Sequence, residues 1–377
     1  ALVLKGSFGL SPKGRQLRNA LIGVQYVASF GLIIGATFMY LQNYYMQNTP
    51  LGYDKDEIII TNMNNNIRKS RDAFASQVKS FSGIEEVTYA EMLLSSQDQY
   101  MGWGRKYRDK DIQFQCLPVE PSFLKVMNVK ISEGRDFREE DKAKRYGTFV
   151  FNERARTEYG LEIGSLIDSM EIVGFMPDVK FASFRTEVTP MAFFVWGTNN
   201  WGNQPNYAYI KVKAGSDLRG AMQHVKTTLQ SFDPEYPFNV RFFDEVLNGL
   251  YEKERSLSSL ITLFSLIAIF ISVVGVFGLV VFDSEYRKKE IGIRKVLGST
   301  TEEIIVMFNK TYIRILCVCF VLGAPIAGYV VHRWLENFAY KTPMYWWVYL
   351  IAFAIIAVIT ILTVTFQNWR AANENPV

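Results

Sequence analysis

The stretch GLSPKGRQ, residues 9–16, has two glycines at the spacing found in a phosphate-binding loop. Such a loop holds phosphate with glycine-rich backbone and then needs Lys followed by Ser or Thr, for the phosphate and its metal ion. Here the second glycine is followed by Arg15 and Gln16, and no β-rich run precedes the stretch. We therefore interpret it as a basic segment and predict that this chain is not an ATPase.

The histidines and acidic residues do not form a recognisable catalytic site either. A metal site or a His-based triad would need suitable partners for His224 or His332, and the sequence shows none at a recognisable spacing. The acidic run at 139–141 lies in a polar turn, where we expect solvated charge. We predict no catalytic residue in this chain, and so no enzyme.

The three cysteines are equally uninformative about chemistry. Cys116 stands alone between the first two apolar runs, so no disulfide can form there. Cys317 and Cys319 lie inside an apolar run, where a C-x-C pair is more typical of helix packing than of metal binding. We predict no metal site and no cofactor.

Four stretches of the chain are long, apolar and almost free of charge. They predict membrane-spanning helices at 20–42, 257–282, 311–332 and 343–366. A helix rises about 1.5 Å per residue, so about 20 residues cross the roughly 30 Å hydrocarbon core of a bilayer. A buried helix of a soluble core is the alternative, but apolar runs of this length are rare there. The sequence therefore indicates an α-helical membrane protein with four transmembrane helices.

Basic residues are unevenly distributed around these spans. The segment 43–256 carries 27 Lys+Arg and 30 Asp+Glu, a net charge of −3, out of 41 and 37 in the whole chain, so the remainder has a net charge of +7. That excess gathers in the lead-in 1–19 and the loop 283–310. Cytoplasmic loops collect Lys and Arg, so we expect this loop, both termini and the tail 371–377 in the cytoplasm.

The segment between the first two spans alternates β-rich and helical patterns, which predicts an inserted α+β domain outside the cytoplasm. Strands are expected near 57–61, 86–89, 112–119, 149–151, 170–174, 191–195, 207–212 and 239–242, and helices near 67–81 and 218–232. The first span is expected to continue as a stalk to about residue 50. From about Asp244 a helical pattern continues into the second span, which predicts one unbroken helix.

The basic loop between the second and third spans, RKKEIGIRKVLGST at 287–300, reads as a short amphipathic helix over 287–297. Ile293, Val296 and Leu297 recur at helical spacing and form an apolar face. Gly298 suits a left-handed C-terminal cap. The spacing of Ser299 and Glu302 predicts a capping box that starts the next helix. Resting on anionic lipid is the simpler alternative to a specific docking role.

The first span carries small residues on one face. Ala28, Gly31 and Gly35 lie at helical spacing and include a Gly-x-x-x-Gly pair. Small residues let helices approach closely in lipid, so we expect this face to pack against another helix. That helix can belong to the same chain or to a second copy.

Several segments resemble MacB/FtsX-type permeases, the membrane subunits of a class of bacterial ABC systems. The loop KKEIGIRKVLGSTTEEI at 288–304 is similar to their cytoplasmic loop, and 246–370 resembles their FtsX-like permease domain. VEPSFLKVMNVKISEGRDF and VGFMPDVKFASF are similar to their periplasmic core, which here would span 51–245. The start of the chain, without Met, resembles the second half of an eight-span member.

The resemblance implies how such a chain would work. Two permease units, in a homodimer or in two halves of one polypeptide, pair with ATPase subunits that carry the ATP and Mg. Nucleic acid is not an expected partner, whereas a periplasmic adaptor or substrate protein is possible. The periplasmic domain would have two lobes, one from 53–100 with 205–245 and the other from 101–204. The loop would dock on the ATPase through Arg287, Lys288, Glu290, Ile291, Ile293, Arg294, Lys295, Leu297 and Gly298.

Two functions of different classes follow from this resemblance. The first is a permease of an inner-membrane export (efflux) or mechanotransmission system, which couples ATP hydrolysis by a separate subunit to work in the periplasm. The second is an FtsX-like signalling or scaffold protein that activates a periplasmic partner, such as a cell-wall hydrolase, without transport. Export from cells would distinguish them.

Overall fold

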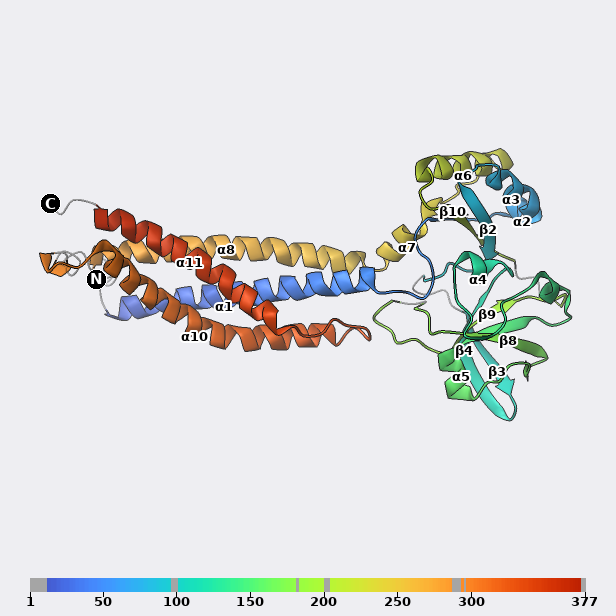
Figure 1. Cartoon of the computed structure of the whole chain (residues 1–377), viewed down its shortest axis with the longest axis horizontal. Helices are drawn as coiled ribbons and strands as arrows, with labels where there is room; N and C mark the ends of the chain where they lie inside the picture. The colour runs from blue at the N-terminus through green and yellow to red at the C-terminus, as the bar shows by residue number, and fades with distance from the viewer. Residues whose placement is uncertain are drawn as a thin grey trace, which may run out of the picture. The chain divides into compact units, whose positions relative to one another are not determined.

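The computed structural model describes residues 12–95, 101–180, 183–199, 204–286, 293–294 and 296–373. The chain divides into two compact units, one of residues 1–48 and 253–377 and one of residues 49–252. We call the first the helical unit and the second the domain (Figure 1). Four helices of spanning length with an inserted α+β domain confirm the predicted fold class.

The first sheet of the domain has four strands in the order β11-β1-β10-β2. These strands are β1 (Ile58–Asn62), β2 (Ile84–Ala90), β10 (Tyr207–Val212) and β11 (Arg241–Phe242), and all neighbours are antiparallel. The helices α2 (Asn65–Lys69), α3 (Arg71–Lys79) and α6 (Leu218–Phe232) contribute to a core with one face of this sheet. In α6 the apolar face carries Ala221, Val225 and Leu229, at the spacing that a helix needs to bury one side.

The second sheet has seven strands, with the main order β3-β4-β9-β6-β8-β5 and β7 paired to β8. The strands are β3 (Met101–Tyr107), β4 (Lys110–Pro118), β5 (Glu133–Gly134), β6 (Thr148–Asn152), β7 (Leu166–Ile167), β8 (Met170–Met176) and β9 (Met191–Val195). Two of its pairings, β4 with β9 and β6 with β8, are parallel. Short helices connect the strands: α4 (Phe123–Val126), the 3-10 helix η2 (Glu139–Ala143) and α5 (Glu153–Tyr159).

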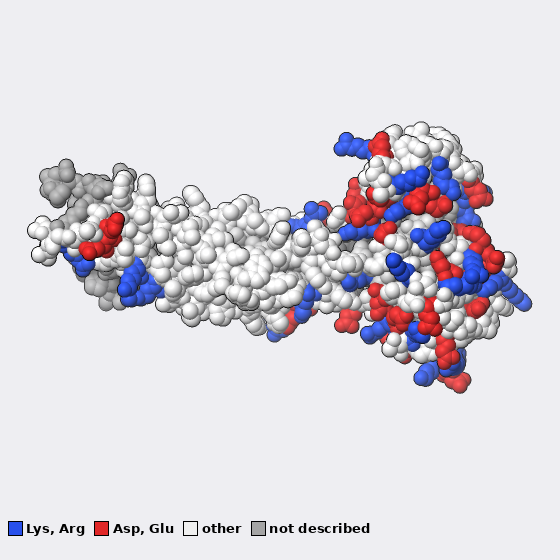
Figure 2. Space-filling model, in the orientation of Figure 1, with Lys and Arg blue, Asp and Glu red and all other residues white. Residues whose placement is uncertain are grey.

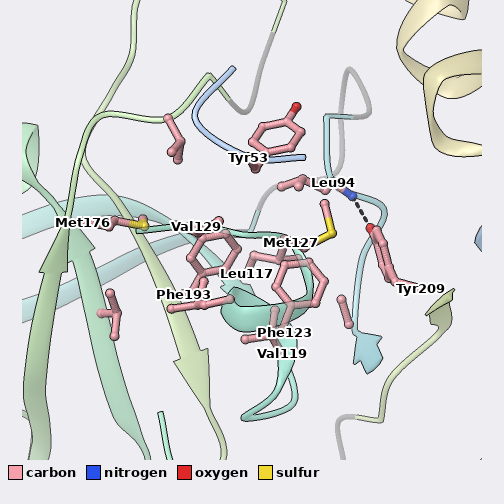
Figure 3. Close-up of a cluster of buried hydrophobic side chains, with 14 of the residues drawn as sticks. Tyr53, Leu94, Leu117, Val119, Phe123, Met127, Val129, Met176, Phe193 and Tyr209 are labelled. Carbon is pink, nitrogen blue, oxygen red and sulfur yellow. Dashed lines mark hydrogen bonds between the residues drawn. The ribbon is translucent and has the colours of Figure 1, made fainter. Parts of the chain in front are cut away.

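Strand residues alternate between cores, as the two-residue period of a strand requires. Phe149 and Phe151 of β6 face an aromatic core with Trp103 and Phe194, whereas Val150 faces the opposite side. That opposite core joins residues of both sheets and is shown in Figure 3, where the amide of Leu94 donates a hydrogen bond of 2.7 Å to the hydroxyl of Tyr209. The two sheets therefore share one continuous hydrophobic core.

The helical unit consists of α1 (Pro12–Asn48), α8 (Glu252–Tyr286), α10 (Thr301–Leu335) and α11 (Trp346–Asn373). Each is long and apolar enough to cross a membrane. The first three extend beyond both ends of the predicted spans, whereas α11 begins three residues after the predicted start at 343 and extends past its predicted end. In α10 a residue is buried at almost every fourth position, from Ile304 through Leu316 to Leu335. Pro325 lies inside this helix, where neighbouring helices can compensate for its missing donor. Figure 2 shows that the visible surface between the ends of the helical unit is nearly free of charge.

The predicted unbroken helix from Asp244 into the second span is wrong. A separate helix α7 (Phe243–Gly249) ends at a turn over 250–251, and α8 begins at Glu252. Tyr251 in this turn accepts a hydrogen bond of 3.0 Å from the amide of Phe184 and packs against that residue's ring. Gly249 at the end of α7 has poor helix propensity, which favours a break there.

Candidate coupling site and helix-packing glycines

The predicted coupling segment is only partly described. Arg287, Lys288, Glu290, Ile291 and Lys295 lie outside the described residues. Ile293, Val296 and Leu297 are described, and 62%, 89% and 79% of their surfaces are exposed. The described part of the loop therefore presents an apolar corner that the described residues of this chain leave largely uncovered.

A tight turn fixes the end of this apolar corner. Gly298 has a φ of +92°, a left-handed conformation that L side chains rarely adopt. The amide of Ser299 donates to the carbonyl of Arg294 at 2.9 Å, the long hydrogen bond of a Schellman-type C-cap. The Arg294 guanidinium lies 2.8 Å from the sulfur of Met307 in α10. Gly298 thus ends the loop helix as its sequence position suggested.

The capping box that starts α10 lies one residue later than predicted. Thr300, not Ser299, is the N-cap: its hydroxyl accepts from the amide of Glu303 at 3.2 Å. The Glu303 carboxylate in turn accepts from the amide of Thr300 at 3.2 Å. Ser299 and Glu302 have the same spacing, but Ser299 already closes the turn after Gly298, so Thr300 is the first residue free to cap α10.

The predicted glycine face of α1 faces open space within the described chain. A Cβ placed on Gly31 or Gly35 would meet no atom within 4 Å, and Ala28 is exposed. No partner helix is therefore found for this face among the described residues of the chain. Packing against a second copy stays a prediction.

A different set of glycines lies at close helix contacts. A Cβ on Gly323 of α10 would lie 3.4 Å from the Cα of Val27 in α1, and one on Gly23 would lie 3.6 Å from the sulfur of Cys319. A Cβ on Gly275 of α8 would overlap the side-chain amide of Gln25. Sequence reasoning missed these positions because no local motif marks glycines that meet across two distant segments.

Polar side chains join the helices at a few points. Ser29 and Ser272 share a hydrogen bond of 2.9 Å between α1 and α8, and Tyr26 and Thr360 share one of 3.0 Å between α1 and α11. Interhelical hydrogen bonds of this kind suit an apolar surrounding, where water cannot replace them.

A further polar side chain of α1 forms hydrogen bonds with the connection between α10 and α11. The amide nitrogen of Gln42 donates to the carbonyl of Tyr340 at 3.0 Å, and its amide oxygen accepts from the backbone of Thr342 at 2.8 Å. One buried side chain thus satisfies two backbone groups.

The acidic run at 139–141 was predicted to be solvated, and for Asp141 this is wrong. Its side chain is 1% exposed and accepts two hydrogen bonds of 2.8 Å from Arg135. Burial alone would raise the pKa of Asp141, but donors from Arg135, the Arg138 amide and Lys144 outweigh it and lower the pKa to about 2. Glu139 and Glu140 are exposed, as expected. The buried carboxylate caps the start of η2, where it accepts from the Arg138 amide at 2.8 Å.

Groups that could perform chemistry are dispersed. Among the described residues, no three His, Cys, Asp or Glu side chains come together in a way that could hold a metal ion. His224 lies on α6, contacts the carbonyl of Gln77 at 3.0 Å and stacks on Phe81. His332 lies 3.4 Å from Glu336 near the end of α10. Cys116 is buried, and burial raises the pKa of its thiol.

Two family models match the chain. The MacB-like periplasmic core domain matches residues 22–228, more than half of the chain, and the FtsX-like permease C-terminal domain matches residues 262–376. The chain belongs to the family of MacB/FtsX-type ABC permeases. The resemblance inferred from the loop and core motifs is thereby confirmed, and this permease is an inner-membrane protein with an extracytoplasmic domain.

Curated relatives agree with this assignment at low identity. The permease is 23% identical over 230 residues to the macrolide export ATP-binding/permease protein MacB of Chromobacterium violaceum. It is 23% identical over 233 residues to the MacB of Escherichia coli strain K12. Each match covers 58% of this chain and 35% of the relative, so the matched part is about a third of the length of these proteins.

Similar solved structures include the periplasmic region of MacB from Actinobacillus actinomycetemcomitans, with 13% identity and a TM-score of 0.39 over 55% of this chain and 98% of that chain. The extracellular domain of the ABC-type transporter YknZ from Gram-positive bacteria has 12% identity and a TM-score of 0.36 over 49% of this chain and 99% of that chain.

Proposed function

We propose that this permease couples ATP hydrolysis by a separate ATPase subunit to conformational work in its extracytoplasmic domain, in an export or mechanotransmission system. The observation that carries the proposal is the apolar corner of the loop after α8. Ile293, Val296 and Leu297 are exposed next to a turn that Gly298 fixes. An apolar helix face that ends in a rigid cap suits docking into a groove of a partner protein. ATP and Mg bind the partner and not this chain.

The proposed orientation follows the distribution of basic residues. The loop after α8 and the N-terminus face the cytoplasm, because these two parts collect the excess of Lys and Arg. The C-terminus lies on the same side as the N-terminus, because the described part of the chain has an even number of spans. The domain then lies on the periplasmic side. In this orientation the apolar corner is on the side where ATP is available.

A second permease unit completes the proposed assembly. The open face of α1 at Gly31 and Gly35 allows another helix to approach closely. That helix comes from a second copy or from the other half of a longer polypeptide. Two units would then present two loops to a pair of ATPase subunits.

The decisive test of coupling is charge placed in the apolar corner. Leu297→Asp or Gly298→Val should abolish stimulation of the partner ATPase, because one removes an apolar anchor and the other blocks the left-handed turn. Arg294→Gln with Lys295→Gln should weaken stimulation only partly. Leu166→Asp is a matched control, since Leu166 is 60% exposed in the domain. The measurements are ATPase activity of the reconstituted complex and co-purification of the ATPase.

The opposite pattern would contradict docking. In that pattern the ATPase fails to co-purify with the Arg294→Gln, Lys295→Gln variant and still co-purifies with Leu297→Asp. The loop would then be an electrostatic anchor to anionic lipid, where each basic residue adds roughly 1 kcal/mol of binding free energy.

Transport and activation of a periplasmic partner can be tested separately once coupling is established. Macrolides are a first class of substrate to test, because the names of the curated relatives give macrolide export as their activity. ATPase-dependent export of a macrolide from cells would support transport. Coupled ATPase activity with no export, together with ATPase-dependent activation of a cell-wall hydrolase, would favour the signalling alternative.

A further inference from the structure

The domain contains a cleft of about 360 Å³ where its two sheets meet. One wall comes from α2, α3 and the end of β2, and the other from the end of β4, η2 and the residues after β9. We call it the inter-lobe cleft. Its volume lies at the lower end of the range of ligand pockets, roughly 300 to 1,000 Å³.

Backbone pairing between the sheets borders this cleft. Ala90 and Val119 form an isolated antiparallel bridge. On either side of it, the amide of Glu91 donates to the carbonyl of Pro118 at 3.0 Å, and the amide of Glu120 donates to the backbone carbonyl of Tyr89 at 2.9 Å. These backbone groups are satisfied, so a ligand would be recognised mainly by side chains.

The side chains that line the cleft carry excess positive charge. Four cations line it against two carboxylates, Glu91 and Glu120, which gives a net charge of +2 when both are ionised. The cations are Arg68, Lys69, Arg71 and Lys142. Charges that converge on a concave surface attract ions of the opposite sign.

One carboxylate already shows how the cations can be bridged. Glu120 accepts from Arg71 at 2.5 Å and from Lys142 at 2.6 Å, so two cations from different elements lie at the spacing that one carboxylate spans. Lys142 also pairs with Glu139 at 3.1 Å. In the part of the chain that the structure describes, Arg68 donates to neutral oxygens alone, including the carbonyl of Pro205 at 3.2 Å. Lys69 is exposed and makes no ion pair with the described residues. Positive charge is therefore left over after the internal pairing.

The remaining lining adds flat apolar surface. Tyr89, Trp196, Pro118 and Pro205 all border the cleft. Arg71 lies 5.9 Å from the centre of the Tyr89 ring, which holds its guanidinium against the wall. A ligand that joins an apolar group to an anion would use both kinds of surface.

We propose that the inter-lobe cleft binds a small carboxylate ligand with an apolar group beside the carboxylate, such as the C-terminal end of a peptide. The ligand carboxylate accepts from Lys69, Arg71 and Lys142, of which the last two also bind Glu120. The apolar group lies against Tyr89 and Trp196. Because the ligand contacts elements of both sheets, binding would tie them together at this edge. The site is independent of the ATPase and of the proposed coupling function.

Calorimetry on the full permease in detergent at low salt, without an ATPase, tests this binding. The probe is the dipeptide Ala-Phe, with its C-terminal amide as the matched ligand that lacks the anion. The free acid should bind at least about tenfold more tightly than the amide, and added salt should weaken it, because charged hydrogen bonds dominate.

Variants locate the site. Lys69→Glu should weaken binding of Ala-Phe at least about tenfold, since it reverses a charge that forms no ion pair with the described residues. Lys226→Glu is the matched control, because Lys226 is exposed on α6 and does not line the cleft. The proposal is overturned if acid and amide bind equally, if neither binds, or if both variants act alike. Binding of phenyl phosphate without binding of the dipeptide would also overturn the carboxylate assignment.

Discussion

The helical unit and the domain both bury polar side chains, but they stabilise them differently. Between the helices most buried polar contacts are neutral, such as Ser29 with Ser272 and Tyr26 with Thr360. Asp283 near the end of α8 is an exception, since its carboxylate accepts from the hydroxyl of Tyr312 at 3.2 Å. In the domain a fully ionised centre is buried at Asp141, with several donors around it.

The difference follows from what surrounds each group. Burying an unpaired charge in an apolar membrane costs much free energy, so neutral polar groups are favoured there. A neutral hydroxyl can instead bond to a carbonyl of its own helix, so a hydrogen bond between two helices adds little to stability. In the domain, Arg135, Lys144 and a backbone amide reach one carboxylate, which offsets the cost of removing it from water. Loss of a polar group should therefore be costly in the domain and mild between the helices.

The largest expected effect is from Asp141→Ala. It leaves Arg135 without its carboxylate and removes the acceptor for the Arg138 amide, so the domain should lose about 3 kcal/mol of unfolding free energy. Glu139→Ala in the same 3-10 helix is the control, because that side chain is 75% exposed and should matter by less than about 1 kcal/mol. Denaturant unfolding of both variants measures the difference. Equal losses would mean that burial of the centre is unimportant.

Substitution of glycines at helix contacts should have the next largest effect on stability. Gly323→Leu forces a side chain against the backbone of Val27 and should cost about 2 to 3 kcal/mol, seen as a lower melting temperature in detergent. Gly31→Leu and Gly35→Leu, which face open space in this chain, should leave that melting temperature nearly unchanged and instead reduce oligomer size. A normal oligomer in both would mean that this face meets only lipid.

These two cases show what sequence patterns can and cannot predict. The spans and the α+β domain were predictable because apolar runs and strand periodicity are local properties. The Gly-x-x-x-Gly pair at Gly31 and Gly35 is local too, but it shows only that close approach is possible. The contact of Gly323 with Val27 joins segments almost 300 residues apart, which no window along the sequence reveals.

Other misses have the same origin. Strand β3 was not predicted because Gly102 and Gly104 lower its β propensity, and pairing with β4 forms it nevertheless. Asp141 looked solvated because its neighbours are acidic, whereas its burial depends on how Arg135 folds back on it. The apolar corner at Leu297 was predictable from helical spacing, but its exposure required the structure.

Acid provides an independent test of the ionised centre in the domain. The pKa of Asp141 is about 2 in the folded chain and about 3.9 in an unfolded one, so the folded form favours the ionised carboxylate. This stabilisation, about 3 kcal/mol, is fully present only above about pH 5 and is lost as the pH falls through 2. The stability difference between the native chain and Asp141→Asn should therefore shrink between pH 5 and pH 2. A constant difference would mean that Asp141 is not ionised.

The smallest expected effect is at the serine pair between α1 and α8. Ser29 lies 2.9 Å from Ser272 and 3.4 Å from the carbonyl of Ala268, so its hydroxyl has a second acceptor when the pair is broken. Hydrogen bonds between membrane helices contribute about 0.6 kcal/mol on average. A double-mutant cycle with Ser29→Ala and Ser272→Ala in detergent should give a coupling of that size. A coupling above about 2 kcal/mol would contradict the comparison, because a neutral pair between helices would then stabilise as much as the ionised centre of the domain.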